Sequence, residues 1–372
     1  MMTPKYKKQR QRAKSGDAKP RETNGAIGRL NHEANPSVLK ASMQLLVSRR
    51  IVARGEVDLP CIPALLDFYL ARLCAMWDSL GKPFTVEESD QLRQGLEQYL
   101  RIGYQASPFA RLVIAYEAEP TKGVVYGIRA EQPTMQEHYA HWIANREGPL
   151  FGNAADAKLV ALVAEIAAPM EVKVLDVGAG TGRNAIALAK HGHPTLAIEA
   201  VTELADAMRK AAAAAEVSIE IVEADILSPD MLLERHAFGL VVVSEVLTHF
   251  RSVREVKCLF EKLAGAVSPG GLVLANAMLA RENYQPDAAV REVSQTAWSF
   301  VLTREELSFI TEGLPFELVS DESMHDYEQA HLAPEHWPPT GWFESWTQGT
   351  NVFALPAGTA PIEMRWLLYR KQ

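Results

Sequence analysis

Residues 174–200 constrain the fold of this chain more than any other stretch, because a strand, a glycine-rich turn, a helix and a second strand follow one another there. Gly178, Gly180 and Gly182 form the turn, where the missing Cβ atoms let the backbone bend sharply and approach a ligand closely. The second strand ends at a carboxylate, Glu199. This order predicts a βαβ unit with a right-handed crossover and a ligand at the open end of the helix.

The spacing of the glycines argues against a dinucleotide cofactor. A dinucleotide fingerprint reads Gly-x-Gly-x-x-Gly, and Arg183 stands where its third glycine would be. An arginine side chain there would hinder the close helix packing that glycine permits. Glu199 lies about twenty residues beyond the turn, where a carboxylate accepts the two hydroxyls of a ribose.

The turn and its flanks read Leu-Asp-Val-Gly at residues 175–178 and Gly-Thr-Gly-Arg-Asn at residues 180–184. This pattern resembles motif I of the class I S-adenosylmethionine-dependent methyltransferases, most of all the tellurite-resistance branch. The resemblance covers residues 156–372 and implies a Rossmann-like α/β fold with a seven-stranded, mostly parallel sheet. It also implies S-adenosyl-L-methionine as the cofactor and methyl transfer as the reaction.

The resemblance assigns the core residues that would bind the cofactor. Asp176 and the glycines would hold its methionine end, Glu199 its ribose and Asp225 its adenine amino group. The expected binding residues of the core are Asp176, Gly178, Ala179, Gly180, Thr181, Gly182, Arg183, Asn184, Glu199, Ala200, Asp225, Ile226 and Ser244.

A polar and aromatic helix is expected over residues 136–147, just before the first core strand. In related enzymes such a helix closes over the methionine end, which implies cofactor contacts for Tyr139, Trp142 and Arg146. The alternative is that these three residues only pack the junction between domains. Two histidines of this helix, at 138 and 141, lie three residues apart, but no nearby carboxylate or cysteine completes a metal site.

Later segments follow the strand order of that fold. The expected elements are strands at 219–222, 240–243 and 272–275, a helix at 253–267, a turn at 268–271, and a final antiparallel pair at 316–320 and 362–369. Thr303 and Glu306 form a capping box that opens another helix, which ends near Gly313.

Two titratable side chains follow the fourth core strand, where the family places the transferred methyl group. This turn contains Glu245 and His249 as candidate catalytic residues, and it has neither an Asn/Asp-Pro-Pro-aromatic motif nor a Pro-Cys pair. The first absence argues against methylation of DNA amino groups or glutamine, and the second against pyrimidine C5-methylation. His249 suits a general base for a hydroxyl or carboxyl-type acceptor. The alternative is that it only braces the cofactor loop.

The expected function is therefore methyl transfer to a small organic molecule, with oxygen as the acceptor atom ahead of nitrogen, carbon or a chalcogen. One alternative is a protein or RNA methyltransferase guided by the N-terminal region. Another is a scaffold protein that binds the cofactor without turnover, and a dehydrogenase ranks last. The acceptor is expected to meet an insertion at 323–361, a connection long enough to form a lid. Its aromatic and histidine residues are His325, Tyr327, His331, His336, Trp337, Trp342, Phe343 and Trp346.

Charge is unevenly distributed along the 372 residues. Residues 1–30 carry nine Lys or Arg against Asp17 and Glu22, a net charge of +7 in a chain of net charge −8. Such a basic segment without apolar periodicity is expected to be a disordered tail, and contact with nucleic acid is the alternative. The acidic remainder argues against a long nucleic acid lying across the active site.

Composition is that of a cytoplasmic enzyme. The chain shows neither a membrane-spanning apolar run nor a signal-peptide pattern. Cys61, Cys74 and Cys258 are scattered, which favours a reducing compartment.

An N-terminal cap domain is expected over residues 31–132, with a connecting segment at 133–155. Apolar residues at helical spacing predict helices, and residues 110–118 and 124–130 predict a β-hairpin. A helical cap of this kind covers the substrate or forms a homodimer.

Overall fold

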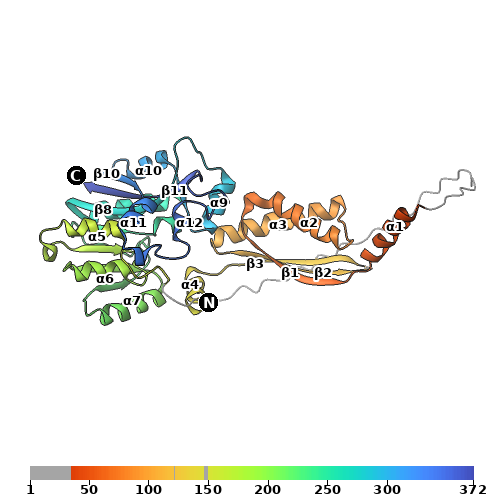
Figure 1. Cartoon of the computed structure of the whole chain (residues 1–372), viewed down its shortest axis with the longest axis horizontal. Helices are drawn as coiled ribbons and strands as arrows, with labels where there is room; N and C mark the ends of the chain where they lie inside the picture. The colour runs from red at the N-terminus through yellow and green to blue at the C-terminus, as the bar shows by residue number, and fades with distance from the viewer. Residues whose placement is uncertain (1–34, 121, 146–149) are drawn as a thin grey trace, which may run out of the picture. The chain divides into compact units, whose positions relative to one another are not determined.

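The computed structural model describes residues 35–120, 122–145 and 150–372, which form two compact units that divide between Pro133 and Thr134 (Figure 1). The expected basic tail at 1–30 and Arg146 lie outside the described residues. None of the helices within these ranges combines the length and apolar character that a membrane crossing needs.

The first unit combines helices with an antiparallel sheet. Its elements are α1 (Pro36–Ser48), β1 (Ala53–Pro60), η1 (Pro63–Leu65), α2 (Leu66–Ser79), α3 (Val86–Ala106), β2 (Arg111–Glu119) and β3 (Gly123–Glu131). The strand order is β1-β2-β3, so the expected hairpin is present, but it is joined by a strand that the sequence analysis missed. β1 escaped detection because charged residues interrupt it and leave only weak apolar alternation.

The capping residues that the sequence predicts at helix N-termini of this unit form the expected hydrogen bonds. Asn35 accepts a hydrogen bond from the backbone N–H of Ser37 at the start of α1, where Pro36 takes the first position. Thr85 and Glu88 form the expected capping box of α3. The helix register then buries Leu92, Leu96 and Leu100 of α3.

The second unit is an α/β domain. Its elements are α4 (Met135–Ala144), α5 (Ala157–Ala164), η2 (Pro169–Glu171), β4 (Val174–Val177), α6 (Arg183–Lys190), β5 (Thr195–Glu199), α7 (Thr202–Ala214), β6 (Glu220–Glu223), β7 (Phe238–Val243), η3 (Leu247–His249), α8 (Val253–Ala266), β8 (Val267–Ala280), α9 (Ala288–Thr296), β9 (Val301–Leu302), α10 (Arg304–Thr311), β10 (Phe316–Ser323), α11 (Met324–His331), η4 (Pro334–His336), α12 (Phe343–Thr347) and β11 (Ile362–Lys371).

The sheet has the Rossmann-like order that the sequence implies. Its strands run β10-β11-β8-β7-β4-β5-β6, with β4 to β8 parallel and β11 antiparallel to both of its neighbours. The chain proceeds outward from β4 through β5 and β6, then returns to the other side of β4 with β7. Ligands of open α/β sheets bind at the carboxyl ends of the strands beside such a reversal.

The described sheet has eight strands, one more than expected, because the two-residue β9 pairs with the side of β8. The expected turn at 268–271 was wrong as well. β8 already begins at Val267, and its pairing with β7 shifts register between Phe238 and Leu240. Gly270 has φ +75°, a left-handed conformation that glycine adopts easily. This conformation allows a bulge within β8 at the register shift.

The central strands are buried on both faces of the sheet, which explains their continuous apolar runs. Val174 and Leu240 pack on the side of α5, whereas Leu175 and Val241 pack on the side of α8. This rigid core fixes the loops that follow β4, β5 and β7.

Candidate functional site

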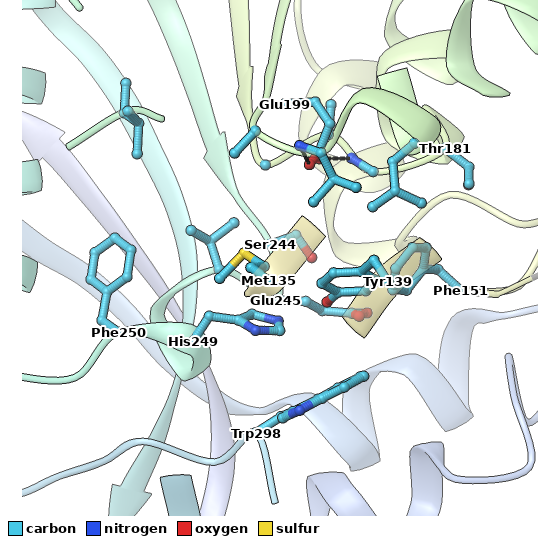
Figure 2. A pocket seen from close by; sticks show the side chains of 18 of the residues that line it. Met135, Tyr139, Phe151, Thr181, Glu199, Ser244, Glu245, His249, Phe250 and Trp298 are labelled. Atoms are coloured by element: carbon cyan, nitrogen blue, oxygen red, sulfur yellow. Dashed lines mark hydrogen bonds between the residues drawn. The ribbon is translucent and has the colours of Figure 1, made fainter. Parts of the chain in front are cut away.

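A cavity of about 640 Å³ opens in the second unit at the carboxyl ends of β4, β5 and β7 (Figure 2). Of the sequence-predicted site residues, its lining takes in Asp176, Gly178, Ala179, Gly180, Thr181, Arg183, Asn184, Glu199, Ala200, Asp225, Ile226, Ser244, Glu245, His249, Tyr139 and Trp142. Gly182 is not in the lining, and Arg146 lies outside the described residues.

The three glycines of the turn have different roles. Gly178 has φ +65° and Gly180 has φ +56°, a region that glycine adopts without strain. A Cβ on Gly178 would overlap Cγ2 of Val246, so the chain approaches the next loop more closely than any side chain allows. Gly182, at φ +87°, faces α7, where a Cβ would lie 2.6 Å from Cγ of Met208. The missing side chain of Gly182 therefore allows close packing against α7, and a contact of this residue with the cofactor stays a prediction.

Glu199 ties the glycine turn to the end of β5. Its Oε2 accepts a hydrogen bond from the N–H of Gly180 at 2.7 Å, and its Oε1 accepts one from Val201 at 2.9 Å (Figure 2). Burial raises the pKa of this carboxyl, and the backbone hydrogen bonds oppose the rise. Each oxygen keeps lone-pair capacity for a ligand hydroxyl.

Asp176, the penultimate residue of β4, has a buried carboxyl and is only 2% exposed. Within the described ranges, its Oδ2 is buried without a hydrogen-bond partner. Burial raises the pKa of Asp176 to about 7, although the nearby Arg183 guanidinium opposes the shift. An unpaired buried acceptor is costly unless a ligand supplies a donor, so this atom is suited to an ammonium group.

Arg183 is the centre of a buried polar network. Its Nη1 donates to Oδ1 of Asp156, and its Nη2 donates to Oε1 of Glu245 at 2.7 Å. Oδ2 of Asp156 in turn accepts hydrogen bonds from Ser244 at 2.7 Å and Asn184 at 2.8 Å. The polar side-chain groups of Arg183, Asn184 and Ser244 thus form hydrogen bonds within the protein. These residues line the cavity mainly through their backbone atoms and the sides of their side chains.

Glu245 occupies a constrained position two residues after the end of β7. Its φ of +62° is unusual for a residue with a side chain, and its N–H donates to Oδ1 of Asn276 at 2.8 Å. Burial raises the pKa of Glu245 to about 7, and the ion pair with Arg183 opposes that rise. The carboxylate is therefore engaged with a guanidinium, an arrangement typical of a structural anchor.

His249 points its ring into the cavity from η3 (Figure 2). The imidazole lies against Trp298, with ring centroids 5.6 Å apart, and against Tyr139 at 6.3 Å. Burial lowers its pKa to about 4, and the neighbouring His138 adds to the shift. The ring is therefore neutral at neutral pH and has a nitrogen lone pair that can accept a proton.

Aromatic rings enclose the same end of the cavity. Trp142 lies 5.8 Å from Tyr139, 5.7 Å from Phe151 and 5.2 Å from Trp298, all between ring centroids. Tyr139 and Trp142 come from α4, whose capping box joins Thr134 to the Glu at position 137. The helix ends at Ala144, earlier than expected. Sequence reasoning missed Phe151 and Trp298, because neither belongs to a motif or an apolar repeat.

The opposite end of the cavity is more open. Asp225 is exposed there, and its Oδ1 accepts a hydrogen bond from the N–H of Leu227 at 2.8 Å. Ile226 is buried beside it.

The 323–361 insertion contributes only part of its aromatic set. Trp342 and Trp346 line the cavity, whereas Trp337 packs against Phe343 and the ring of His325 outside the lining. No group of three His, Cys, Asp or Glu side chains in the described ranges is arranged to hold a metal ion.

Comparison with known protein families identifies the class of reaction. Residues 174–271 match the family model described as a methyltransferase domain, and these residues supply the glycine turn, Glu199 and Glu245. The chain is a methyltransferase. The sequence motif predicts S-adenosyl-L-methionine as its cofactor. No curated protein matches the sequence of this methyltransferase.

Solved structures with a similar fold include other methyltransferases. Geranyl diphosphate C-methyltransferase from Streptomyces coelicolor A3(2) is 12% identical, with a TM-score of 0.46 over 64% of this chain and 98% of that chain. The StiE O-MT is 16% identical, with a TM-score of 0.41 over 58% of this chain and 73% of that chain. At these identities the similarity concerns the fold alone.

Proposed function

We propose that this methyltransferase transfers the methyl group of its cofactor to the hydroxyl oxygen of a small organic molecule. The observation that carries the proposal is the position of the His249 imidazole, which lies in an aromatic-walled cavity next to the glycine turn. A hydroxyl acceptor loses a proton on methylation, and a neutral imidazole at the cavity wall is suited to take it.

The residues present fit the cofactor. The unpartnered Oδ2 of Asp176 suits the α-ammonium group, and the two oxygens of Glu199 suit the ribose hydroxyls. Asp225 would accept from the adenine amino group, and Tyr139 with Trp142 would cover the methionine end, where aromatic faces favour a cation. When bound, the cofactor supplies an activated methyl group, so the protein mainly has to align the acceptor.

We assign Glu245 a supporting part in this chemistry. Its ion pair with Arg183 fixes the loop between β7 and η3, and His249 is the last residue of η3. His249 is thus our candidate base, and the sequence-predicted catalytic role of Glu245 is restricted to placing that loop.

Replacing His249 with glutamine should slow turnover by about a hundredfold or more, the usual contribution of a general base, while cofactor affinity changes little. The wild-type rate should stay flat between pH 9 and 6, because a base of pKa about 4 remains unprotonated there. Transfer of labelled methyl groups into a fractionated cell extract measures the rate, and calorimetric titration with S-adenosylhomocysteine measures affinity. Equal losses in rate and affinity would remove the base assignment.

The same labelling experiment separates the alternatives for the acceptor. Label in small molecules supports the proposal, whereas label in protein or RNA would favour a macromolecular methyltransferase guided by the N-terminal unit. Cofactor binding without any transfer would indicate a catalytically inactive scaffold protein.

A homodimer through the first unit is the partner we propose. Six large apolar residues of α1 are more than half exposed, namely Val38, Leu39, Met43, Leu45, Leu46 and Val47, and no residue of this helix is buried. A helix of 13 residues is marginal in water without a packing partner. A second copy would pair the two apolar helices symmetrically.

The double variant Leu39→Lys and Met43→Lys should therefore convert a dimer into a monomer of 41.1 kDa. Light scattering coupled to size-exclusion chromatography measures the mass. A wild-type protein that runs as a monomer at micromolar concentration would contradict the proposed dimer. Lys40→Ala, on the same helix, is the matched control and should leave the mass unchanged.

A further inference from the structure

Trp298 occupies a backbone position that normally belongs to glycine. After α9, the N–H of Ser299 donates to the carbonyl of Ser294 at 2.8 Å, and the N–H of Trp298 donates to that of Gln295 at 3.3 Å. This pair of bonds defines a Schellman motif, whose left-handed residue is most often glycine. Trp298 holds that place with φ +52°. A bulky aromatic residue in this conformation is strained, and such strain gathers where a side chain serves function.

The insertion between β10 and β11 fixes this strained turn. Nε1 of Trp346 donates to the carbonyl of Trp298 at 2.8 Å. Nδ2 of Asn351 donates to the carbonyl of Ala297 and to Oγ of Ser299, both at 3.0 Å. The turn is therefore held on both sides of Trp298, which fixes the direction of its Cα–Cβ bond.

That direction is the aromatic end of the cavity. The indole lies 5.8 Å from the ring of Tyr139, 5.2 Å from Trp142 and 5.6 Å from His249. Figure 2 shows Trp298 facing His249 and Tyr139 across the same space. The neighbouring N–H of Phe300 donates to the carbonyl of Thr248 at 3.2 Å, which ties the turn to the segment that carries His249.

We propose that Trp298 is a positioning residue of the methyl-transfer site, held by Trp346 and Asn351, which fixes Tyr139 and Trp142 over the methionine end of the cofactor. The inference rests on the proposed placement of the cofactor in this cavity. The inference assigns a function to the 323–361 insertion, because its Trp346 and Asn351 side chains hold the turn from which the indole projects. Neither residue contacts α4 directly through the bonds described, so their effect on that helix passes through Trp298.

The test is the replacement Trp298→Gly, which removes the indole and at the same time relieves the backbone strain. S-adenosylhomocysteine is the probe, and calorimetric titration gives its Kd. Affinity should fall about tenfold, as expected when several aromatic contacts that preorganise a site are lost. The melting temperature should stay level or rise, since glycine adopts this conformation freely. Trp298→Phe, which keeps an aromatic ring, should recover part of the affinity.

Glu216 provides a matched control, because it occupies the same position after α7. It has φ +55°, its N–H donates to Ala213, and the N–H of Val217 donates to Ala212. Glu216 does not line the cavity. Glu216→Gly should therefore relieve the same backbone strain without any change in the Kd for S-adenosylhomocysteine.

The Asn351→Ala variant tests the link to the insertion. It should weaken S-adenosylhomocysteine binding in the wild-type background and have little further effect when combined with Trp298→Gly, because coupled residues are not additive. A folded Trp298→Gly protein that binds the probe like wild type would overturn the inference. If the Trp298→Gly protein does not fold, the Asn351→Ala protein provides the test. An unchanged affinity of that protein for S-adenosylhomocysteine would then overturn the inference. A wild-type protein that does not bind the probe would instead refute the cofactor placement.

Discussion

Replacing Arg183 with methionine should lower the free energy of unfolding by about 3–5 kcal/mol, the typical cost of leaving buried charges without their partner. The guanidinium is 11% exposed and pairs with both Asp156 and Glu245, whose side chains are 3% and 15% exposed. Methionine fills much of the volume but leaves both carboxylates in a poorly solvated site. Urea denaturation of both proteins at pH 8 measures the difference.

The deficit of the Arg183→Met protein should shrink as the pH falls from 8 toward 5. Burial already raises the pKa of Glu245 to about 7 while Arg183 opposes the rise, so loss of the guanidinium raises that pKa further. A group whose pKa is raised on folding favours the folded state at low pH and loses that contribution as the pH increases. The destabilisation is therefore largest at the pH where the buried carboxyl of Glu245 must be ionised. A deficit that does not change with pH would contradict this account.

Arg209→Met is the control for charge removal alone. Arg209 also bridges two carboxylates, Asp206 and Glu223, but it is 41% exposed. Ion pairs at the surface contribute about 0–1 kcal/mol, so this variant should differ little from wild type. A similar loss in both variants would mean that burial of the Arg183 network has no special importance.

Replacing Glu199 with glutamine should weaken S-adenosylhomocysteine binding about a hundredfold or more, because two ligand hydrogen bonds and the shape of the turn depend on one carboxylate. Its two oxygens accept from Gly180 and Val201, and a glutamine amide would present an NH₂ group to one of these N–H donors. The glycine turn would then move away from the end of β5. Calorimetric titration measures the loss.

Glu223→Gln is the matched control for this variant. Glu223 pairs with Glu199 in the register of β5 and β6, so the two residues end neighbouring parallel strands at the same level. Glu223 is exposed and does not line the cavity. Its replacement should leave the affinity unchanged. Comparable affinities for the two variants would show that Glu199 does not contact the cofactor.

The order of the core strands was predictable because their burial leaves a direct trace in the sequence. Strand β7 ends in a continuous apolar run, β4 is apolar except for Asp176, and the helix starts at Thr85 and Thr303 carry complete capping boxes. β1 was missed because its outward face is charged and it is stabilised by pairing with β2, a contact between residues far apart in sequence. The bulge in β8 likewise depends on its register against β7, which no local pattern records.

The cavity lining was largely predictable from the glycine turn, since the motif itself fixes which residues follow each strand. The sequence did not reveal Asp156, which lies 27 residues before its partner Arg183 and has no motif of its own. Nor did it reveal Trp298, whose significance lies in a φ of +52° at a position where glycine is usual. Gly182, which the motif predicts to contact the cofactor, is absent from the cavity lining, and a Cβ at this position would meet Met208.

The position of β11 has a consequence for the order in which the site is assembled. This strand, Ile362–Lys371, comes after all the others in the chain, yet it lies inside the sheet between β8 and β10. During synthesis, the strands that carry the glycine turn and Glu199 are complete long before it emerges. Until β11 pairs, β8 presents a free edge and the insertion is anchored at one end only. The half of the cavity that contains Glu199 can thus form first, whereas the half shaped by Trp346 and Asn351 must wait for residues 362–371.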